Sequence, residues 1–175
     1  MKNTWLVAGL GNPGPRYAGT RHNAGRATVA ELARREGLRF SVHKAQALVA
    51  EGAPGADGRF VFAQPNTFMN SSGGPLAQLM RFYDVSPDRL IVVHDDLDLP
   101  FGTLRLKFGG GHGGHNGVRD IIARLGTPEF TRVRIGIGRP GTDGAVIDFV
   151  LQRFTAVQRR QVDQVFADAA DAVEM

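Results

Sequence analysis

A histidine and a group of carboxylates are the residues of this chain whose types and spacing most directly suggest catalysis. His22 lies in the stretch TRHNAG, at the entrance of a predicted helix, and Asp95, Asp96 and Asp98 lie at the end of an apolar run. A carboxylate there could accept a hydrogen bond from an imidazole, fix its tautomer and support it as a general base. Only one acid is needed for that part. The other two fit solvated turn residues equally well, and a lone histidine at a helix entrance is often a surface cap.

Water is the predicted nucleophile of such a site. The chain contains no cysteine and no G-x-S-x-G motif. Ser71 and Ser72 are predicted to cap a helix rather than to attack a substrate. An activated water molecule is therefore the expected attacking group.

A metal site is the alternative that the histidines leave open. His94 with Asp95 and Asp96, or His112 with His115, offers ligand types that divalent metals use. Neither set carries a helical H-E-x-x-H pattern or another organised ligand spacing. We therefore expect catalysis without a metal ion.

The stretch GLGNPG, Gly9 to Gly14, matches the G-x-G-x-x-G pattern of dinucleotide-binding proteins directly after a predicted strand. Two prolines, Pro13 and Pro15, remove amides that a pyrophosphate would need, and the helical pattern starts only near Asn23. We therefore expect no nucleotide cofactor. Asn12 instead lies just past the end of a strand, where open parallel sheets bind ligands, although it could also cap its own turn.

Two further polar segments could line a pocket. QPNTFMNSSG at residues 64–73 places Asn66 and Asn70 around Phe68 and Met69, which fits either a substrate pocket or an ordinary core at a helix entry. GGGHGGHNG at residues 109–117 allows positive φ angles and close approach of a ligand to the backbone. This glycine-rich segment is predicted to form a moving wall of the pocket, with a slack linker as the alternative.

Strands and helices alternate along the chain and would bring these segments together. Apolar runs predict strands at residues 4–10, 59–64, 89–96 and 132–138, and helical periodicity marks residues 23–37, 71–85, 117–126 and 157–175. A turn predicted at 53–58 adds an antiparallel hairpin. The pattern predicts one α/β domain over residues 1–175, with a mixed, mostly parallel twisted sheet and helices on both faces.

Composition narrows the class of protein. The chain has 175 residues, of which 42% are hydrophobic and 22% charged, as in an ordinary globular domain. Its start resembles neither a signal peptide nor a membrane span, so a cytoplasmic protein is expected. The formal net charge of +4 favours a polyanionic partner.

Five motifs together resemble bacterial-type peptidyl-tRNA hydrolases in order and spacing. They are GLGNPGPRYAGTRHNAG, PNTFMNSSG, HDDLDLPFG, LKFGGGHGGHNGVRDI and FTRVRIGIGRP, and the resemblance extends over about residues 5–155. It implies hydrolysis of the ester between a peptide and the 3′ ribose of tRNA, without a metal or other cofactor. It implies a peptidyl-tRNA partner recognised at the acceptor stem, no membrane, no obligate protein partner and a monomeric enzyme.

The resemblance also implies roles for individual residues. His22 matches the catalytic histidine, Asp95 the acid that orients it, and Asn12 a catalytic-centre asparagine. Substrate-contacting positions are matched by Tyr17, Met69, Asn70, Gly113, His115 and Asn116. Lys107 and Arg134 match a clamp for the tRNA 5′-phosphate, with Arg105, Arg119 and Arg132 as basic neighbours, and a phosphate contact would fix register without reading sequence.

Two departures and two competing hypotheses remain at this point. His112 has no role in the resemblance. Family members usually continue for some fifteen to twenty residues beyond the point matched by Met175, so either the natural protein is shorter or its last helix is truncated here. A pure RNA-binding module would keep the basic clamp without catalysis, and a metal-dependent hydrolase would use His94, Asp95, His112 and His115.

Overall fold

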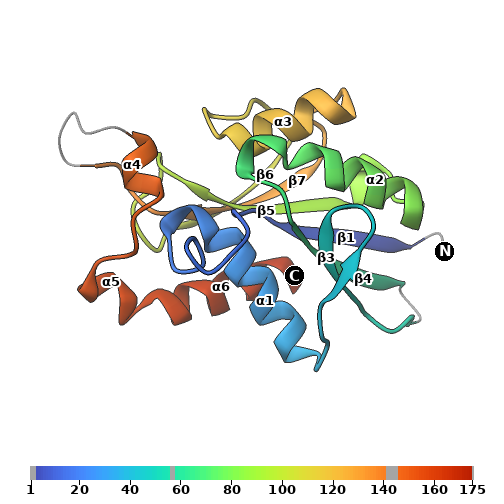
Figure 1. Cartoon of the computed structure of the whole chain (residues 1–175), viewed down its shortest axis with the longest axis horizontal. Helices are drawn as coiled ribbons and strands as arrows, with labels where there is room; N and C mark the ends of the chain where they lie inside the picture. The colour runs from blue at the N-terminus through green and yellow to red at the C-terminus, as the bar shows by residue number, and fades with distance from the viewer. Residues whose placement is uncertain (1–2, 56–57, 141–145, 175) are drawn as a thin grey trace.

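The computed structural model describes residues 3–55, 58–140 and 146–174, and within them one seven-stranded sheet has the order β2-β3-β4-β1-β5-β7-β6 (Figure 1). The four central strands β4, β1, β5 and β7 run parallel, whereas β2, β3 and β6 pair antiparallel at the two edges. This arrangement confirms the predicted mixed sheet. The strands are β1 (Thr4–Gly9), β2 (Ser41–His43), β3 (Ala47–Glu51), β4 (Arg59–Pro65), β5 (Leu90–Asp96), β6 (Leu104–Phe108) and β7 (Thr131–Gly136).

Helices cover both faces of the sheet, as Figure 1 shows. Helices α2 and α3 pack on one face through residues such as Leu79 and Ile121, and α1 and α6 pack on the other through Leu32 and Ala169. The α-helices are α1 (Ala24–Arg35), α2 (Gly73–Tyr83), α3 (Asn116–Leu125), α4 (Val146–Val150), α5 (Ala156–Arg159) and α6 (Val162–Glu174). Short 3-10 turns are η1 (Arg21–Asn23), η2 (Met69–Ser71) and η3 (Pro87–Arg89).

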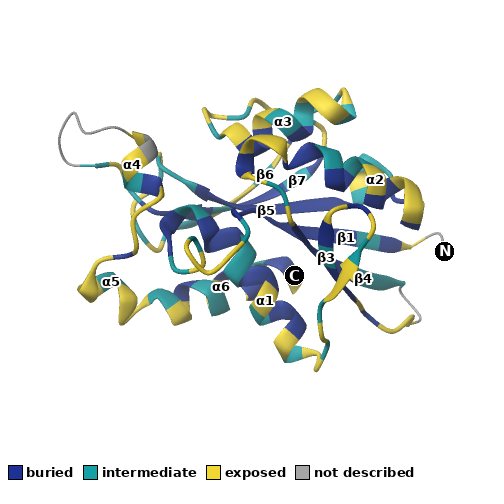
Figure 2. Ribbon diagram, viewed as in Figure 1, coloured by how far each residue is buried: buried dark blue, intermediate teal, exposed yellow. Residues whose placement is uncertain are grey.

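The two middle strands, β1 and β5, are mainly apolar until the polar carboxyl end of β5, because both of their faces are covered. In Figure 2 they and the inner sides of the helices are buried, whereas the outer helix surfaces are exposed. Within β5, Leu90, Val92 and Val93 are fully buried. None of the described helices is long and apolar enough to cross a membrane.

A close contact between backbones sets the position of α1. A Cβ added to Gly25 would lie 2.0 Å from the carbonyl oxygen of Val93, and one added to Gly9 would lie 2.3 Å from the carbonyl oxygen of Gly25. Only glycine at both positions lets the start of α1 rest directly on β1 and β5. The turn η1 just before it, which carries His22, is thereby held beside the carboxyl end of β5.

Several local predictions need correction. β6, α4 and the separate turn α5 were not predicted, and the expected helix over 157–175 is divided between α5 and α6. Ser72 precedes α2 without capping it, because its hydroxyl donates to the carbonyl oxygen of Met69 at 2.7 Å. α1 begins only at Ala24, so the stretch Gly9 to Gly14 does not open a helix as a dinucleotide site requires.

Candidate active site

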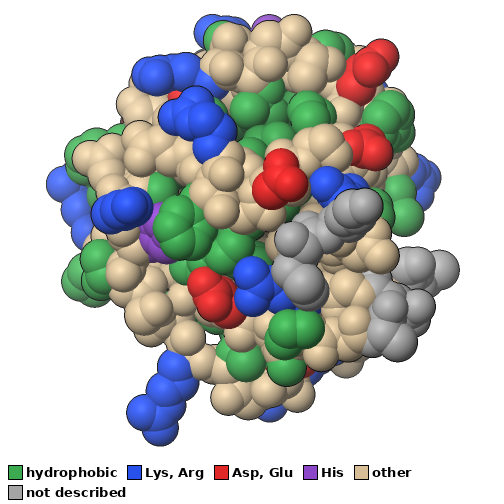
Figure 3. Space-filling model, turned by 90° about the vertical axis from the view of Figure 1, so that its right-hand side faces the viewer, with side chains coloured by type: hydrophobic (Ala, Val, Ile, Leu, Met, Phe, Trp, Pro, Cys, Tyr) green, Lys and Arg blue, Asp and Glu red, His purple; other side chains and the backbone are tan. Residues whose placement is uncertain are grey.

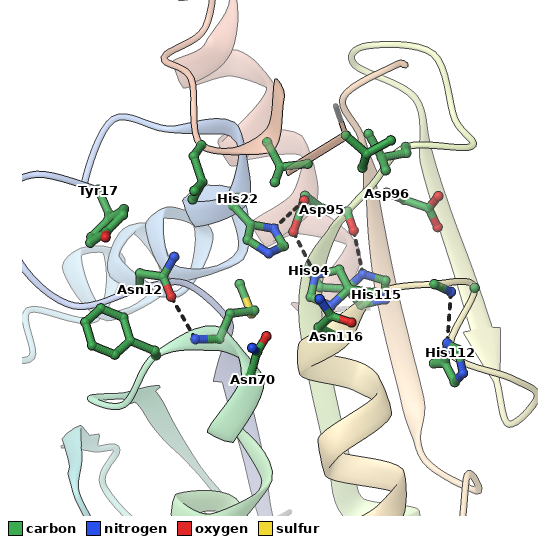
Figure 4. Close-up of a pocket in the computed structure, with 18 residues that line it drawn as sticks. Asn12, Tyr17, His22, Asn70, His94, Asp95, Asp96, His112, His115 and Asn116 are labelled. Atoms are coloured by element: carbon green, nitrogen blue, oxygen red, sulfur yellow. Dashed lines mark hydrogen bonds and ion pairs between the residues drawn. The ribbon is translucent and has the colours of Figure 1, made fainter. Parts of the chain in front are cut away.

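One carboxylate, Asp95 at the carboxyl end of β5, is shared by two imidazoles (Figure 4). Its Oδ2 lies 2.8 Å from Nδ1 of His22, and its Oδ1 lies 2.8 Å from Nε2 of His115. The Asp95 side chain is 2% exposed. The structure thus brings together a histidine from η1, an acid from β5 and a histidine from the loop before α3.

The hydrogen-bond partners decide which ring nitrogens carry protons. Burial by itself raises the pKa of Asp95, but the charges and hydrogen bonds of His22 and His115 outweigh it and hold that pKa well below its usual range. An ionised carboxylate only accepts hydrogen bonds, so Nδ1 of His22 must donate. In neutral His22 this leaves Nε2 as an unprotonated acceptor at the cavity, which is the tautomer of a general base.

The basicity of His22 follows from the same contact. Burial lowers the pKa of the imidazole, but the charge of Asp95 and its hydrogen bond raise it more, so the net pKa lies above the usual value. A raised pKa strengthens His22 as a proton acceptor. It also means that the neutral form is lost at a higher pH than for an exposed histidine.

His115 has a second task at the start of α3. Its Nδ1 accepts hydrogen bonds from the backbone amides of Gly117 and Val118, at 3.1 and 3.3 Å, and so caps the helix. Because Nδ1 accepts, Nε2 carries the proton that is donated to Asp95. The side chain of His115 therefore links the beginning of α3 to the carboxylate of Asp95.

His94 lies behind His22, Asp95 and His115, and its pKa is shifted in the opposite direction to that of His22. Its Nδ1 donates to the carbonyl oxygen of Asp95 at 2.7 Å, and its ring packs 4.8 Å from that of His115. Burial, together with the neighbouring His115, lowers the pKa of His94 to about 3. His94 is therefore neutral at physiological pH and is not a candidate for the base.

A network of asparagines fixes the loop after β1. Oδ1 of Asn12 accepts a hydrogen bond from the backbone amide of Met69 at 2.7 Å, while the backbone of Asn12 is paired in both directions with the side chain of Asn23. Because its oxygen is occupied, Asn12 has its Nδ2 donors left for another partner. Figure 4 places Asn12 and Asn70 on one side of His22 and Asn116 below His94 and His115.

These groups surround a cavity of about 320 Å³, within the range of small-ligand sites. Phe68 is 63% exposed, as the substrate-pocket alternative expects. Met69 is 4% exposed and belongs to the core, as the other alternative expects. Tyr17 packs edge-on against Phe68 with ring centroids 6.2 Å apart. All the substrate residues expected from the sequence line the cavity, which are Tyr17, Met69, Asn70, Gly113, His115 and Asn116.

Comparison with known proteins shows which family the chain belongs to. The sequence model of the family described as Peptidyl-tRNA hydrolase matches residues 6–175. The chain belongs to the peptidyl-tRNA hydrolase family. The peptidyl-tRNA hydrolase of Leifsonia xyli subsp. xyli is 61% identical over 99% of this chain and 91% of its own. That of Frankia casuarinae is 56% identical over 98% of this chain and 86% of its own.

Structural comparison agrees with this membership. The crystal structure of the peptidyl-tRNA hydrolase from Acinetobacter baumannii superposes with a TM-score of 0.90 at 39% identity, covering 99% of this chain and 88% of that one. The resemblance drawn from the five motifs is therefore confirmed at the level of family and fold.

The glycine-rich segment of this peptidyl-tRNA hydrolase family member has a defined backbone. Gly109, Gly110, Gly113 and Gly114 all have positive φ, between 59° and 85°. A Cβ at three of them would meet nothing within 4 Å, and at Gly110 it would meet only the lysine side chain of Lys107, so conformation rather than space favours glycine. Residues 112–116 of the segment line the cavity, so this part is a wall with a defined backbone rather than a slack linker, and its movement stays a prediction.

Arg132 anchors that wall and is not available as a basic surface residue. It is 2% exposed, and its guanidinium donates to the carbonyl oxygens of Gly110, Gly111 and Pro128 at 2.9, 2.5 and 2.9 Å. Its expected place beside a phosphate clamp therefore needs correction. The guanidinium also lies 4.6 Å from the ring centre of Phe130.

The two main clamp candidates lie on two neighbouring antiparallel strands. Lys107 is on β6 and Arg134 on β7, with Arg105 directly opposite Arg134. Nε of Arg134 donates to Oδ2 of Asp96 at 2.7 Å.

Figure 3 views the molecule from the end at which the central strands begin, and there basic and acidic side chains are interspersed.

The two metal sets that the sequence left open as an alternative are not brought together as such among the described residues. His112 points away from the Asp95 group in Figure 4, and its Nδ1 accepts from the amide of Gly114 at 2.9 Å. His22, Asp95 and His115 do offer three ligand atoms within 4.8 Å of one another. Both imidazoles, however, already donate to the carboxylate, and this geometry suits proton transfer as it stands.

Some site residues escaped the sequence analysis. Val146, Val150 and Leu151 of the α4 region line the cavity, and Arg21 holds this region by donating to the carbonyl oxygen of Phe149 at 3.1 Å. The guanidinium of Arg21 also lies 4.1 Å from the Phe149 ring centre. Only the position of Arg21 beside His22 could have marked it, since no local pattern distinguishes a buried arginine.

Proposed function

We propose that this chain hydrolyses the ester that joins a peptide, or an N-blocked aminoacyl group, to the 3′ ribose of tRNA, and so recycles peptidyl-tRNA released from ribosomes. The observation that carries the proposal is the His22–Asp95 pair, with Nε2 of His22 open to a cavity in a member of the peptidyl-tRNA hydrolase family. His22 acts as the general base and Asp95 holds its tautomer.

The reaction needs only water as co-substrate. His22 Nε2 takes a proton from a water molecule while the oxygen of that water attacks the ester carbonyl carbon. The carbonyl oxygen becomes an oxyanion. Asn12 donates to that oxyanion through Nδ2, which its bond to Met69 leaves available. When the carbon–oxygen bond breaks, protonated His22 returns its proton to the 3′ oxygen of the ribose. Peptide acid and free tRNA are the products.

The remaining residues hold the substrate. Asn70 and Asn116 contact the peptide backbone, and the backbone of Gly113, with Tyr17, Met69 and His115, lines the peptide channel. Lys107 and Arg134 bind the 5′-terminal phosphate of the tRNA, a contact that fixes position without reading sequence. RNA helices are recognised mainly by shape, which suits an enzyme that accepts most tRNAs.

We also infer a monomeric enzyme acting in the cytoplasm, without a metal or other cofactor. The proposed base, its orienting acid, the oxyanion donor and the phosphate clamp all come from one chain, so no partner protein has to complete the site. The substrate itself places the activity in the compartment where tRNA is used.

Hydrolysis of N-acetylaminoacyl-tRNA in EDTA tests the proposal, with His22→Ala as the variant. We expect cleavage to survive the chelator and to fall by about 10²-fold or more in the variant, as for loss of a general base. His43→Ala is the control, because this histidine on β2 packs against Phe82 and Tyr83, outside the cavity. Loss of activity in EDTA would favour a metal-dependent hydrolase, and tRNA binding without cleavage would favour an RNA-binding module.

A further inference from the structure

Asp96 is the acid next to the catalytic carboxylate, and both of its oxygens are engaged. Oδ1 accepts the backbone amide of Asp98 at 2.8 Å, and Oδ2 accepts Nε of Arg134 at 2.7 Å. In Figure 4 its side chain points away from His22 and Asp95. The hydrogen bond from the Asp98 amide therefore fixes the orientation of the Asp96 carboxylate independently of its bond to Arg134. Asp96 has no contact with the proposed base, His22.

Arg134 is held at one side of its guanidinium. The contact with Asp96 uses Nε, and among residues 3–55, 58–140 and 146–174 the two terminal nitrogens have no hydrogen-bond partner. The side chain is 25% exposed. A guanidinium has five donors in a rigid plane, so a grip at Nε leaves the terminal fork able to bind a phosphate.

The antiparallel register of β6 and β7 places the backbone of a second cation, Lys107, near Arg134. Arg105 lies directly opposite Arg134, and Lys107 is two residues further along β6, on the same face. Diagonal neighbours of this kind have Cα atoms about 7–8 Å apart, within reach of long side chains. In the structure the end of the Lys107 side chain lies over Gly110, so its ammonium would have to turn toward Arg134 for the two to share one phosphate group.

We propose that Asp96 is a positioning residue for substrate selection: it holds Arg134 so that its terminal nitrogens, together with Lys107, accept a phosphate at a fixed distance from the catalytic centre. The inference rests on the proposed phosphate clamp and goes beyond it. Asp95 and Asp96 are consecutive residues of the rigid strand β5, so the base and the phosphate site share one support.

The opposite role for Asp96 has an opposite signature. A carboxylate beside an arginine also cancels part of its positive charge. If that were its main effect, removing Asp96 would strengthen phosphate binding. If it positions the guanidinium, removing it weakens phosphate binding, because Arg134 must then lose side-chain entropy when the phosphate binds.

The test compares two substrates, N-acetylaminoacyl-tRNA with a 5′-monophosphate and the same molecule after dephosphorylation. The measured quantity is the ratio of kcat/KM for the two. For the unaltered chain we expect a ratio of about ten, a factor that corresponds to roughly 1.4 kcal/mol. Asp96→Ala should bring the ratio down to about two, with the change in KM for the phosphorylated substrate rather than in kcat.

Two further variants separate position from charge. Asp96→Asn removes the charge but keeps one oxygen for Nε of Arg134, and an intermediate ratio is expected. Asp98→Ala is the matched control, since it removes another carboxylate from the same turn. That carboxylate pairs with Arg139 rather than with Arg134. This variant should keep the ratio of the unaltered chain. Thermal unfolding of each variant excludes loss of the fold as the cause.

Each remaining result has a distinct meaning. A ratio that rises in Asp96→Ala and Asp96→Asn would overturn the positioning role and leave the clamp standing. A ratio near one in the unaltered chain, with rapid cleavage of both substrates, would overturn the clamp and this inference but not the hydrolase. An absence of cleavage in the unaltered chain would overturn the proposed function itself, and tRNA affinities measured with both 5′ ends would then still decide whether Asp96 positions Arg134.

Discussion

Asp95 and Asp96 are chemically identical neighbours whose surroundings give them different work. Asp95 is 2% exposed and is shared by two imidazoles, whereas Asp96 is 14% exposed and is shared by a guanidinium and a backbone amide. Successive residues of a strand point to opposite faces, so Asp95 turns toward His22 and Asp96 toward Arg134 of the neighbouring strand β7. The difference between the two regions is therefore set by strand geometry and by the partners on each face.

The partners also determine how each region responds to pH. An imidazole changes charge near neutral pH, so the group formed by Asp95 and its imidazole partners can take up or release a proton there. A guanidinium stays charged in proteins, so the Asp96 contact holds a geometry that proton uptake near neutral pH does not alter. Chemistry is thus expected to depend on pH through the first region and phosphate recognition to depend on salt through the second.

The change Asp95→Asn should have the largest effect in this comparison. An asparagine amide can donate to Nδ1 of His22 and trap the tautomer whose Nε2 carries a proton, so kcat should fall by about 10²–10⁴-fold. The pKa of His22 should fall as well, because burial still lowers it and the carboxylate no longer raises it. The base works only when deprotonated, so the acid limb of the kcat/KM profile moves to lower pH.

The pH–rate profile of the variant beside the unaltered chain measures both effects. Asp98→Asn controls for charge, since Asp98 lies in the same loop, pairs with Arg139 and is exposed. An acid limb that stayed in place while kcat fell would mean that Asp95 acts on orientation alone. Unchanged kcat would contradict its assignment as the orienting acid.

A smaller effect is expected for His115→Ser. Serine keeps a side-chain cap for α3 but cannot reach Asp95, so the variant separates the two tasks of His115. We expect kcat to fall by about tenfold, in line with roughly 1.5 kcal/mol for a hydrogen bond to a charged group, and the unfolding midpoint to change little. If stability fell and kcat did not, His115 would matter as a helix cap only.

The apolar runs of the sequence predict the parallel strands, and the polar residues at the ends of these runs are sufficient to bring His22 near Asp95. The same patterns miss β6, because five residues at a sheet edge alternate charged Arg105 and Lys107 with Leu106 and Phe108, which remain 56% and 60% exposed. No buried face distinguishes such a strand. Only its pairing with β7 reveals it.

Partners from distant parts of the chain account for the other differences. Arg132 and Arg134 lie two residues apart on β7 and carry the same charge. The carbonyl groups of residues 110, 111 and 128 nevertheless bind Arg132 in the interior, whereas Asp96 holds Arg134 at the surface. The bond from His115 to Asp95 likewise joins residues twenty positions apart. Local patterns contain no record of these contacts.

The smallest effect is expected in the second region, from Lys107→Ala. Loss of one cation near the proposed phosphate site should raise KM by a few-fold and reduce the slope of log affinity against log salt by about 0.7–0.9, with kcat nearly unchanged. Lys44→Ala removes the same charge from the turn between β2 and β3, at the opposite edge of the sheet. If both lysine variants lowered the salt slope equally, the basic residues would act through net charge, and the division between a catalytic and a phosphate-binding region would fail. A change confined to Lys107→Ala would instead tie the salt dependence to the face that Asp96 organises.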